Sequence, residues 1–209
     1  MKKVIVLAVL ALAVNAMATI QITEWMYKST ANGGNAEFIE FTNIGSTAID
    51  MTGWSFDDSS RAAGSYSLSG FGTIAAGESV ILTEWTAAAF RTEWNLASSV
   101  KIIGGNGQNL GNGDEINIYD ALNVLVDQLT YGSTPKTEKK SCTVPSTDLG
   151  LETASSSWTL ASVGDSFGSW KSTSNDVGNP GYYYAIPEPA TIAILSIGML
   201  LFRKAARRA

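Results

Sequence analysis

Carboxylates are the only abundant side chains in this sequence that could carry acid–base chemistry. The chain of 209 residues contains 19 Asp and Glu residues and no histidine. Without an imidazole, Ser–His and Cys–His nucleophile pairs and histidine metal sites are excluded. Glu37 and Glu40 belong to one expected strand but point to its opposite faces, so they cannot easily share a substrate. The sequence therefore predicts no catalytic residues and a protein that is not an enzyme.

Further acidic residues flank predicted loops, where the hard oxygen ligands that calcium prefers could gather. The candidates are Asp57, Asp58, Asp114 and Asp120. Adjacent carboxylates diverge in an extended chain, and the spaced Asp-x-Asp-x-Asp-Gly pattern of calcium loops is missing. We therefore expect no metal or cofactor, and a calcium-dependent hydrolase is the less favoured alternative.

Aromatic side chains could form a second kind of site, a platform on which sugar rings stack. The chain has six tryptophans and seven tyrosines. Trp54 fits a core position, whereas the sequence assigns no place to Trp25, Trp85, Trp94, Trp158 and Trp170. A carbohydrate-binding module would need several aromatic side chains exposed on one face.

Charge and cysteine content narrow the choice of partners. Between residues 19 and 186 there are 8 basic and 18 acidic residues, a formal charge of −10. Such a body repels a phosphate backbone, so nucleic-acid binding is not expected. Cys142 is the only cysteine, which excludes an intrachain disulfide and leaves the fold to its core.

Short segments with alternating apolar residues and Gly/Asn turns follow one another from residue 19 to about residue 131. The expected core anchors pair on shared strand faces: Ile39 with Phe41, Trp54 with Phe56, and Ile116 with Ile118. The run Ser79–Thr83 suits a strand buried on both faces. Thr86 followed by three alanines predicts about two turns of helix to Trp94. This pattern favours an all-β sandwich or barrel.

Several segments, taken in order, resemble the bacterial branch of the lamin tail domain. They are Ile22–Glu24, Glu37–Asn43, Ile49–Trp54, Ala76–Leu82, Ala89–Arg91, Leu110–Ile116 and Val126–Gly132, with Gly178–Gly181 resembling the way such domains close. The resemblance covers about residues 19–132. It implies an immunoglobulin-like antiparallel β-sandwich with a binding or structural role, and no shared reaction.

The first eighteen residues have the three parts of a secretory signal peptide. Lys2 and Lys3 precede an eleven-residue apolar run, and Ala16 and Ala18 form a small-x-small cleavage site before Thr19. The run is too short for a stable membrane anchor. We expect passage through the Sec export machinery, cleavage by signal peptidase, and a mature chain that begins near Thr19.

Residues 133–185 are rich in Ser and Thr but contain Trp158, Phe167 and Trp170. A pure linker would lack these aromatic residues. We therefore expect a loosely ordered extension that packs a strand or two onto the body.

Residues 186–209 resemble the PEP-CTERM sorting signal of Gram-negative bacteria. Pro187, Glu188 and Pro189 precede a thirteen-residue apolar run, after which come Arg203, Lys204, Arg207 and Arg208. The run is a marginal transmembrane helix, and its basic cluster should stay on the cytoplasmic side. The resemblance implies recognition by exosortase, a membrane protease-transpeptidase. A plain anchor without processing is the alternative.

Together these patterns predict an exported protein that is first anchored in the inner membrane and then reaches the cell surface or extracellular matrix. We expect a structural or adhesive component that contacts exopolysaccharide or other envelope proteins. A carbohydrate-binding module for exopolysaccharide is the alternative function.

Overall fold

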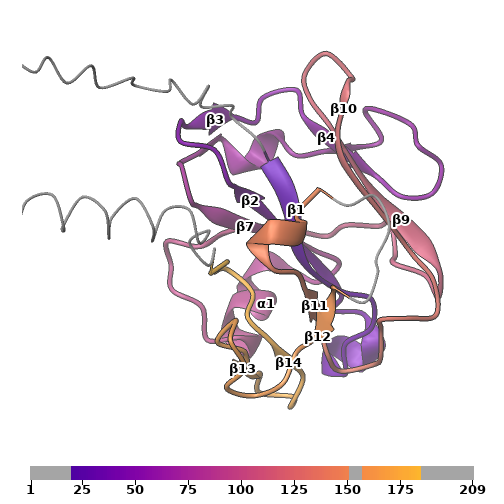
Figure 1. Cartoon of the computed structure of the whole chain (residues 1–209), viewed down its shortest axis with the longest axis vertical. Helices are drawn as coiled ribbons and strands as arrows, with labels where there is room; N and C mark the ends of the chain where they lie inside the picture. Colours follow the sequence, from indigo (N-terminus) through magenta and orange to yellow (C-terminus); the bar gives the residue numbers. More distant parts are fainter. Residues whose placement is uncertain (1–19, 151–156, 185–209) are drawn as a thin grey trace, which may run out of the picture.

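The computed structural model describes residues 20–150 and 157–184. This part of the chain is mostly β-structure, with fourteen strands and one α-helix (Figure 1). The residues of the expected signal-peptide cleavage site, Ala16, Ala18 and Thr19, and the whole segment 186–209 lie outside the described residues.

The larger of two main sheets has six strands in the order β12-β11-β1-β2-β7-β8. Their bounds are β1 Ile20–Met26, β2 Phe38–Asn43, β7 Ser79–Thr83, β8 Lys101–Gly104, β11 Cys142–Thr143 and β12 Thr159–Leu160. The central strands β1, β2 and β7 are antiparallel neighbours. All residues of β2 and β7 are buried, which confirms that Ser79–Thr83 is covered on both faces.

The second sheet has four strands in the order β10-β9-β4-β5. Their bounds are β4 Ser55–Asp57, β5 Tyr66–Ser67, β9 Asp114–Tyr119 and β10 Leu125–Tyr131. Two small antiparallel pairs complete the strands, β3 Ile49–Asp50 with β6 Thr73–Ile74 and β13 Trp170–Lys171 with β14 Val177–Gly178. The two main sheets form the layers of a β-sandwich (Figure 1).

The α-helix α1 spans Ala87–Glu93, and the hydroxyl of its N-cap Thr86 accepts a bond from the amide of Ala89. The predicted helix is thus confirmed. It connects β7 to β8, and these two strands are parallel. The expectation of a purely antiparallel sandwich is wrong at this pair, because a helical crossover returns the chain in the same direction as the strand it left.

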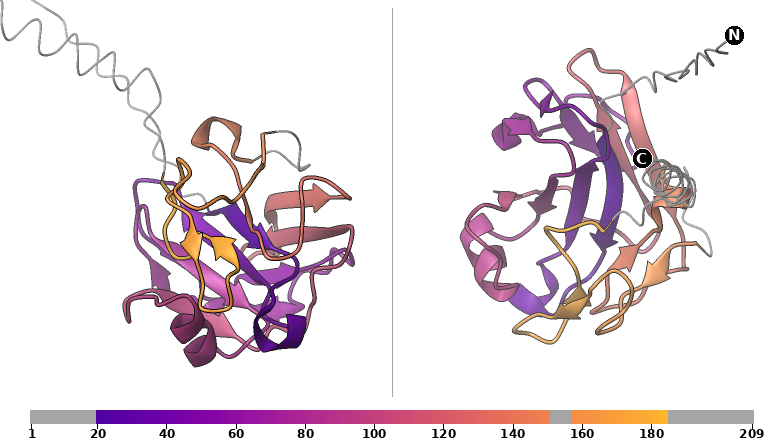
Figure 2. Two further views of the ribbon diagram at one scale, coloured as in Figure 1. Left: turned by 90° about the horizontal axis from the view of Figure 1, so that it is seen from below. Right: turned by 60° about the vertical axis from the view of Figure 1, so that its left-hand side comes forward.

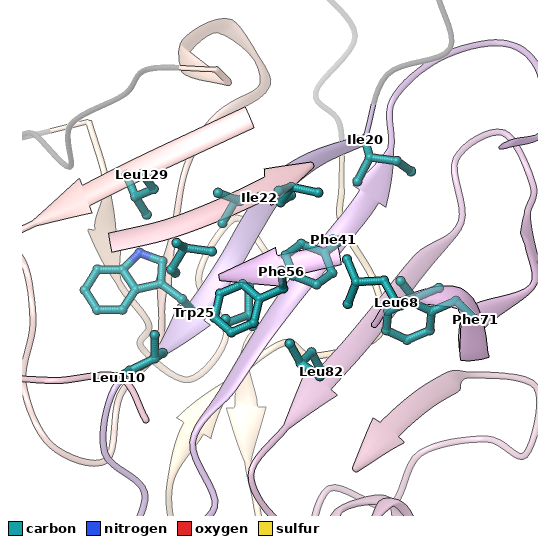
Figure 3. Close-up of a cluster of buried hydrophobic side chains, with 14 of the residues drawn as sticks. Ile20, Ile22, Trp25, Phe41, Phe56, Leu68, Phe71, Leu82, Leu110 and Leu129 are labelled. Atoms are coloured by element: carbon teal, nitrogen blue, oxygen red, sulfur yellow. The ribbon is translucent and has the colours of Figure 1, made fainter. Parts of the chain in front are cut away.

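The main core lies between the two sheets (Figure 3). The anchors Ile39, Phe41, Phe56, Ile116 and Ile118 are at most 1% exposed and belong to one apolar cluster. Figure 3 shows Phe41 of the larger sheet and Phe56 of the smaller one within the same layer of side chains. The alternation of the sequence therefore identified the inward faces of β2, β4 and β9.

Trp54 is the anchor that the structure corrects. Its side chain is only partly buried and packs on the margin of the main core. It shares parity with Phe56, but β4 begins one residue later, at Ser55, after a turn in which Gly53 has a φ of 81°. The position is therefore at the rim of the sandwich and not between the sheets.

A β-bulge in β1 changes which residues face the core. The pairing of β1 with β2 shifts between Ile22 and Glu24, so that Ile22 opposes Phe41 while Glu24 opposes Glu40. The extra residue is Thr23. Because of this shift, Ile22 and Trp25 both belong to the main core although they are three residues apart.

The segment after residue 132 is built into the sandwich. Strand β11 pairs with β1, and β12 pairs with β11, so this segment supplies two strands of the larger sheet. Further along, the pair β13–β14 and the residues after it lie against the strands of the larger sheet (Figure 2). The described body continues to Tyr184.

Candidate functional site

The four candidate calcium ligands do not come together. Asp114 begins β9 and Asp120 follows its end, which separates them by about 20 Å of extended strand. Each of the four carboxylates accepts bonds within its own turn: Asp57 from the amide of Ala62 (2.9 Å), Asp58 from Ser60 (3.2 Å), Asp114 from Gly111 (2.7 Å) and Asp120 from Leu122 (2.8 Å). These aspartates stabilise turns, a role that local sequence cannot distinguish from metal binding.

The surroundings of Asp57 illustrate this structural role. Burial acts to raise the pKa of Asp57, but hydrogen bonds from the loop after β4 outweigh it and hold the pKa below its ordinary value. Among residues 20–150 and 157–184, no group of three or more His, Cys, Asp or Glu side chains is arranged to hold a metal ion. The described body therefore offers no geometric support for a calcium-dependent hydrolase.

A different set of carboxylates is buried on the other side of the larger sheet. Glu24 and Glu40 are directly opposite each other on β1 and β2, and both are 0% exposed. With Thr23, Thr42 and Ser79 they form what we call the outer polar cluster. The hydroxyl of Thr42 shares one hydrogen bond with that of Thr23 (2.8 Å) and another with that of Ser79 (2.7 Å).

The outer polar cluster is covered by the closing segment, which we define as residues 178–184. The amide of Gly181 donates to Oε2 of Glu40 (2.7 Å), and the amide of Asn179 donates to Oε1 of Glu24 (2.8 Å). The hydroxyl of Ser141 also donates to Oε1 of Glu24. Two buried carboxylates thus hold the end of the body on its first two strands.

Tyr183 fixes the same segment from its other end. Its side chain is 6% exposed, its amide donates to the hydroxyl of Ser79 (3.2 Å), and its phenol donates to the carbonyl of Val144 (2.8 Å). Gly178 is required here, because a Cβ at this position would lie 2.8 Å from Oε1 of Glu24 and from Oγ of Ser141. Close contact between the closing segment and Glu24 therefore depends on a glycine.

The electrostatics of the pair follow from its burial. Desolvation, and after it the charge of Glu40, raise the pKa of Glu24 well above its ordinary value. Desolvation also raises the pKa of Glu40, although bonds from Thr23 and the closing segment oppose the shift. Near neutral pH the pair therefore retains protons that exposed carboxylates would have lost.

Two more carboxylates are buried at the edges of the main core. Desolvation raises the pKa of Glu37 to about 8, and its carboxylate accepts the amide of Leu110. Desolvation raises the pKa of Asp127 in β10 to about 6, and Asp127 accepts the amide of Ile22 beside the bulge in β1 (2.8 Å). Each of these carboxylates binds a backbone amide of another segment, so their geometry is that of a structural support.

The aromatic residues separate into buried and exposed groups. Trp25, Trp94 and Trp158 are at most 4% exposed and belong to the body's interior, with Trp25 stacked on Tyr131 at a centroid distance of 4.1 Å. Trp54, Trp85 and Trp170 are partly buried. The exposed aromatic surface comes instead from Tyr182 (59%) and Tyr184 (48%) in the closing segment.

Tyr182 and Tyr184 line an open cleft of about 360 Å³ together with Phe167, Trp170, Asp165 and Ser166. Their alternation with the buried Tyr183 is the sequence signal that could have located this cleft, since alternate residues of an extended segment share one side. No comparable signal marks Glu24 and Glu40, because their burial depends on the closing segment that covers them.

The remaining sequence expectations concern Cys142 and the segment 186–209. Cys142 is buried, its thiol donates to the carbonyl of Pro135 (2.7 Å), and burial raises its pKa to about 12, which suppresses its reactivity. Pro187, Glu188, Pro189 and the basic residues from Arg203 onward lie outside the described residues. Within the part that the structure describes, no helix has the length and apolar character needed to span a bilayer.

Comparison with known proteins gives one match. The family model of the lamin tail domain matches residues 13–133, which is more than half of the chain and includes β1 to β10. No curated protein and no solved structure matches significantly. The matched range contains the whole second sheet, the four strands β1, β2, β7 and β8 of the larger sheet, and both buried glutamates of the outer polar cluster, and the chain belongs to the lamin tail domain family.

Proposed function

We propose that this protein is an exported, non-catalytic structural or adhesive component of the cell envelope or extracellular matrix. The observation that carries the proposal is the engagement of its buried carboxylates. Glu24, Glu37 and Glu40 each accept a backbone amide, and none of them lines either of the two clefts that the structure shows among its described residues. Such an arrangement supports a stable module that presents surfaces rather than one that turns over substrate.

The proposed cellular location rests on the two ends of the sequence. A signal peptide over residues 1–18 would direct the chain to the Sec machinery and signal peptidase. The PEP-CTERM-like tail over residues 186–209 would anchor a precursor in the inner membrane of a Gram-negative host through a transmembrane helix, until exosortase releases it to the surface. The described body ends at Tyr184, two residues before this tail, so a rigid module would be joined to the sorting signal by almost no linker.

Mass spectrometry of the surface-associated protein tests the proposed location. We expect the mature form to lack the apolar run 190–202, whereas a plain anchor would retain it. Replacing Pro187, Glu188 and Pro189 by alanine should leave export intact and trap the protein in the inner membrane. Equal surface delivery of this variant, measured by protease accessibility on whole cells, contradicts exosortase sorting. Deletion of residues 190–202 is the matched control, because it removes the membrane segment and leaves the motif.

Assays of the purified protein test the non-catalytic part. We expect no turnover of esters, peptides or common glycans. Hydrolysis that is abolished by Asp57→Asn or Asp114→Asn, in variants whose melting curves match the wild type, would show instead that these turn-forming carboxylates are catalytic.

A further inference from the structure

The cleft beside the closing segment has a well-supported aromatic wall. Tyr182 and Tyr184 stand side by side with their ring centroids 6.3 Å apart and their planes at 44°. Trp170 is held against the buried Trp94 in an edge-to-face contact at 5.9 Å. Phe167 is 7% exposed and forms the buried part of the lining. Two exposed rings thus project over a base whose aromatic residues are fixed by the body.

The hydroxyl groups around the cleft are few, and those of Tyr182 and Tyr184 are uncommitted. The structure shows no hydrogen-bond partner in the described residues for the phenol hydroxyls of Tyr182 and Tyr184. The hydroxyl-bearing Ser166 is exposed on the same lining. Each of these hydroxyls can both donate and accept. A ligand that carries hydroxyl groups at its edges would therefore find partners around the aromatic surface.

Among the described residues that line the cleft, Asp165 is the only carboxylate, and its oxygens are already occupied. Oδ1 accepts the amides of Phe167 (3.0 Å) and Ser169 (3.1 Å), and Oδ2 accepts the amide of Ser162 (3.0 Å) and the hydroxyl of Ser169 (2.9 Å). A carboxylate has about four lone-pair sites, so Asp165 has none left for a ligand. Its function is to shape the loop 162–169 that forms one side of the cleft.

Charge narrows the ligand class further. The lining contributed by the described residues contains no Lys or Arg, and residues 19–186 carry a formal charge of −10, so an anionic ligand is disfavoured. A quaternary ammonium ion would gain cation–π attraction, but the carboxylate that could pair with it is committed to the loop. What remains is a neutral ring with apolar faces and hydroxyl edges.

We propose that the cleft formed by Phe167, Trp170, Tyr182 and Tyr184 binds a neutral oligosaccharide. The apolar face of a sugar ring stacks on Tyr182 or Tyr184, because the C–H groups of the sugar carry partial positive charge and the aromatic face is negative. The volume is at the lower end for small-molecule sites, which suits one or two sugar units of a longer chain crossing an open cleft. This ligand class deepens the proposed surface role and rests on it only for the presence of glycans nearby.

Isothermal titration of the full-length protein in a non-glycosidic detergent tests the cleft. The probes are neutral hexasaccharides built from glucose, mannose, galactose or N-acetylglucosamine. We expect saturable binding of at least one of them, weakened about tenfold by Tyr182→Ala or Tyr184→Ala through loss of stacking. Tyr184→Phe keeps the ring and should cost only about threefold through loss of one hydrogen bond.

Matched controls make the result decisive. Leu122→Ala removes an apolar side chain that is 82% exposed on the turn between β9 and β10, and it should leave affinity unchanged. Both tyrosines are exposed, so their replacement should not alter the melting curve. The proposal is overturned if no neutral hexasaccharide binds, if only oligogalacturonate or tetramethylammonium binds, or if both Tyr→Ala variants bind like the wild type. Surface delivery is measured separately, so failure here and failure of the sorting proposal are distinguishable.

Discussion

The two faces of strands β1 and β2 are covered in opposite ways. On the inner face, Ile22, Trp25 and Phe41 pack against the second sheet without a polar partner between them (Figure 3). On the outer face, Glu24 and Glu40 are just as fully buried but are bonded to backbone amides of the closing segment. Equal burial therefore hides two kinds of stabilisation.

The two kinds of stabilisation differ in whether they need a fixed geometry and in how strongly they depend on pH. Apolar burial is non-directional and varies little with pH, whereas a buried carboxylate stabilises the fold only in the right protonation state and with its partners in place. The inner face gives the body its stability. The outer face determines where the closing segment lies, because the amides of Asn179 and Gly181 each meet an oxygen of one buried carboxylate.

Phe41→Ala is expected to have the largest effect on this comparison. Phe41 is 0% exposed and lies edge-on to Phe71 at 6.4 Å, so its removal leaves a cavity between the sheets. We expect a loss of ~3–5 kcal/mol in the free energy of unfolding. Guanidinium melts at pH 5 and pH 8 measure it, and the loss should be the same at both. A strongly pH-dependent loss would contradict the division between the faces.

The second expectation concerns the wild-type protein. Glu24, Glu37, Glu40 and Asp127 have raised pKa values in the folded state, so between pH 4.5 and about 8 the folded chain binds more protons than the unfolded one. Stability must then fall as the pH rises through this window. We expect a decrease of roughly 2 kcal/mol or more, measured by guanidinium melts at half-unit steps of pH.

Glu24→Gln sharpens that test. It removes one titrating group of the outer polar cluster and should flatten the decrease, while Glu37 and Asp127 leave a residual slope. Below pH 4 the sign reverses, because Asp57 and Glu115 have lowered pKa values and their contribution is lost on protonation. A stability that rises steadily from pH 5 to pH 8 would show that the buried carboxylates are ionised without cost.

Glu40→Ala should reduce the free energy of unfolding less than Phe41→Ala does. Glu40 precedes Phe41 in β2 and points to the opposite face of the larger sheet. The variant leaves the hydroxyl of Thr23 and the amide of Gly181 without their acceptor but also removes a buried acid. We expect a loss of ~1–2 kcal/mol at pH 5 and less at pH 8. Hydrogen exchange should accelerate at Gly181 and remain unchanged in β9. Glu138→Ala, on the exposed ion pair with Lys28, is the control and should cost under ~1 kcal/mol.

Trp54→Ala is expected to cost about as little as Glu40→Ala. Trp54 is only partly buried at the rim. Removal of its indole ring therefore leaves a depression that water can fill and not a closed cavity. We expect a loss of ~1–2 kcal/mol in guanidinium melts, well below that of Phe41→Ala. A loss equal to that of Phe41→Ala would place Trp54 energetically in the core.

The inner face was predictable from sequence because its signal is local. Alternation identified Ile39, Phe41, Ile116 and Ile118, and the N-cap preference of Thr86 located α1. These properties depend on residues close together in the chain. The parallel pair β7–β8 escaped prediction, since a short apolar strand does not encode the direction of its neighbour.

The outer face was not predictable, because its partners are remote. Glu40 meets Gly181 across 141 residues, and nothing in the sequence around Glu40 indicates that a later segment will exclude water from it. The bulge at Thr23 has a similar origin: it exchanges the faces of the residues after it and invalidates simple alternation in β1. Carboxylates in strands therefore reveal their burial only when the covering segment is known.

The contact between Asn179 and Glu24 also fixes the order in which the body can be completed. The two residues in contact are 155 positions apart in the sequence, and β1 also needs β11, which follows it much later in the chain, as its neighbour in the sheet. A chain that is synthesised or translocated amino end first presents β1 and β2 long before residues 178–181 arrive, and contacts between such distant segments form slowly. The body can therefore complete its fold only after the closing segment has been made. A chain truncated before residue 178 would contain every strand of both main sheets, with Glu24 and Glu40 still open to water.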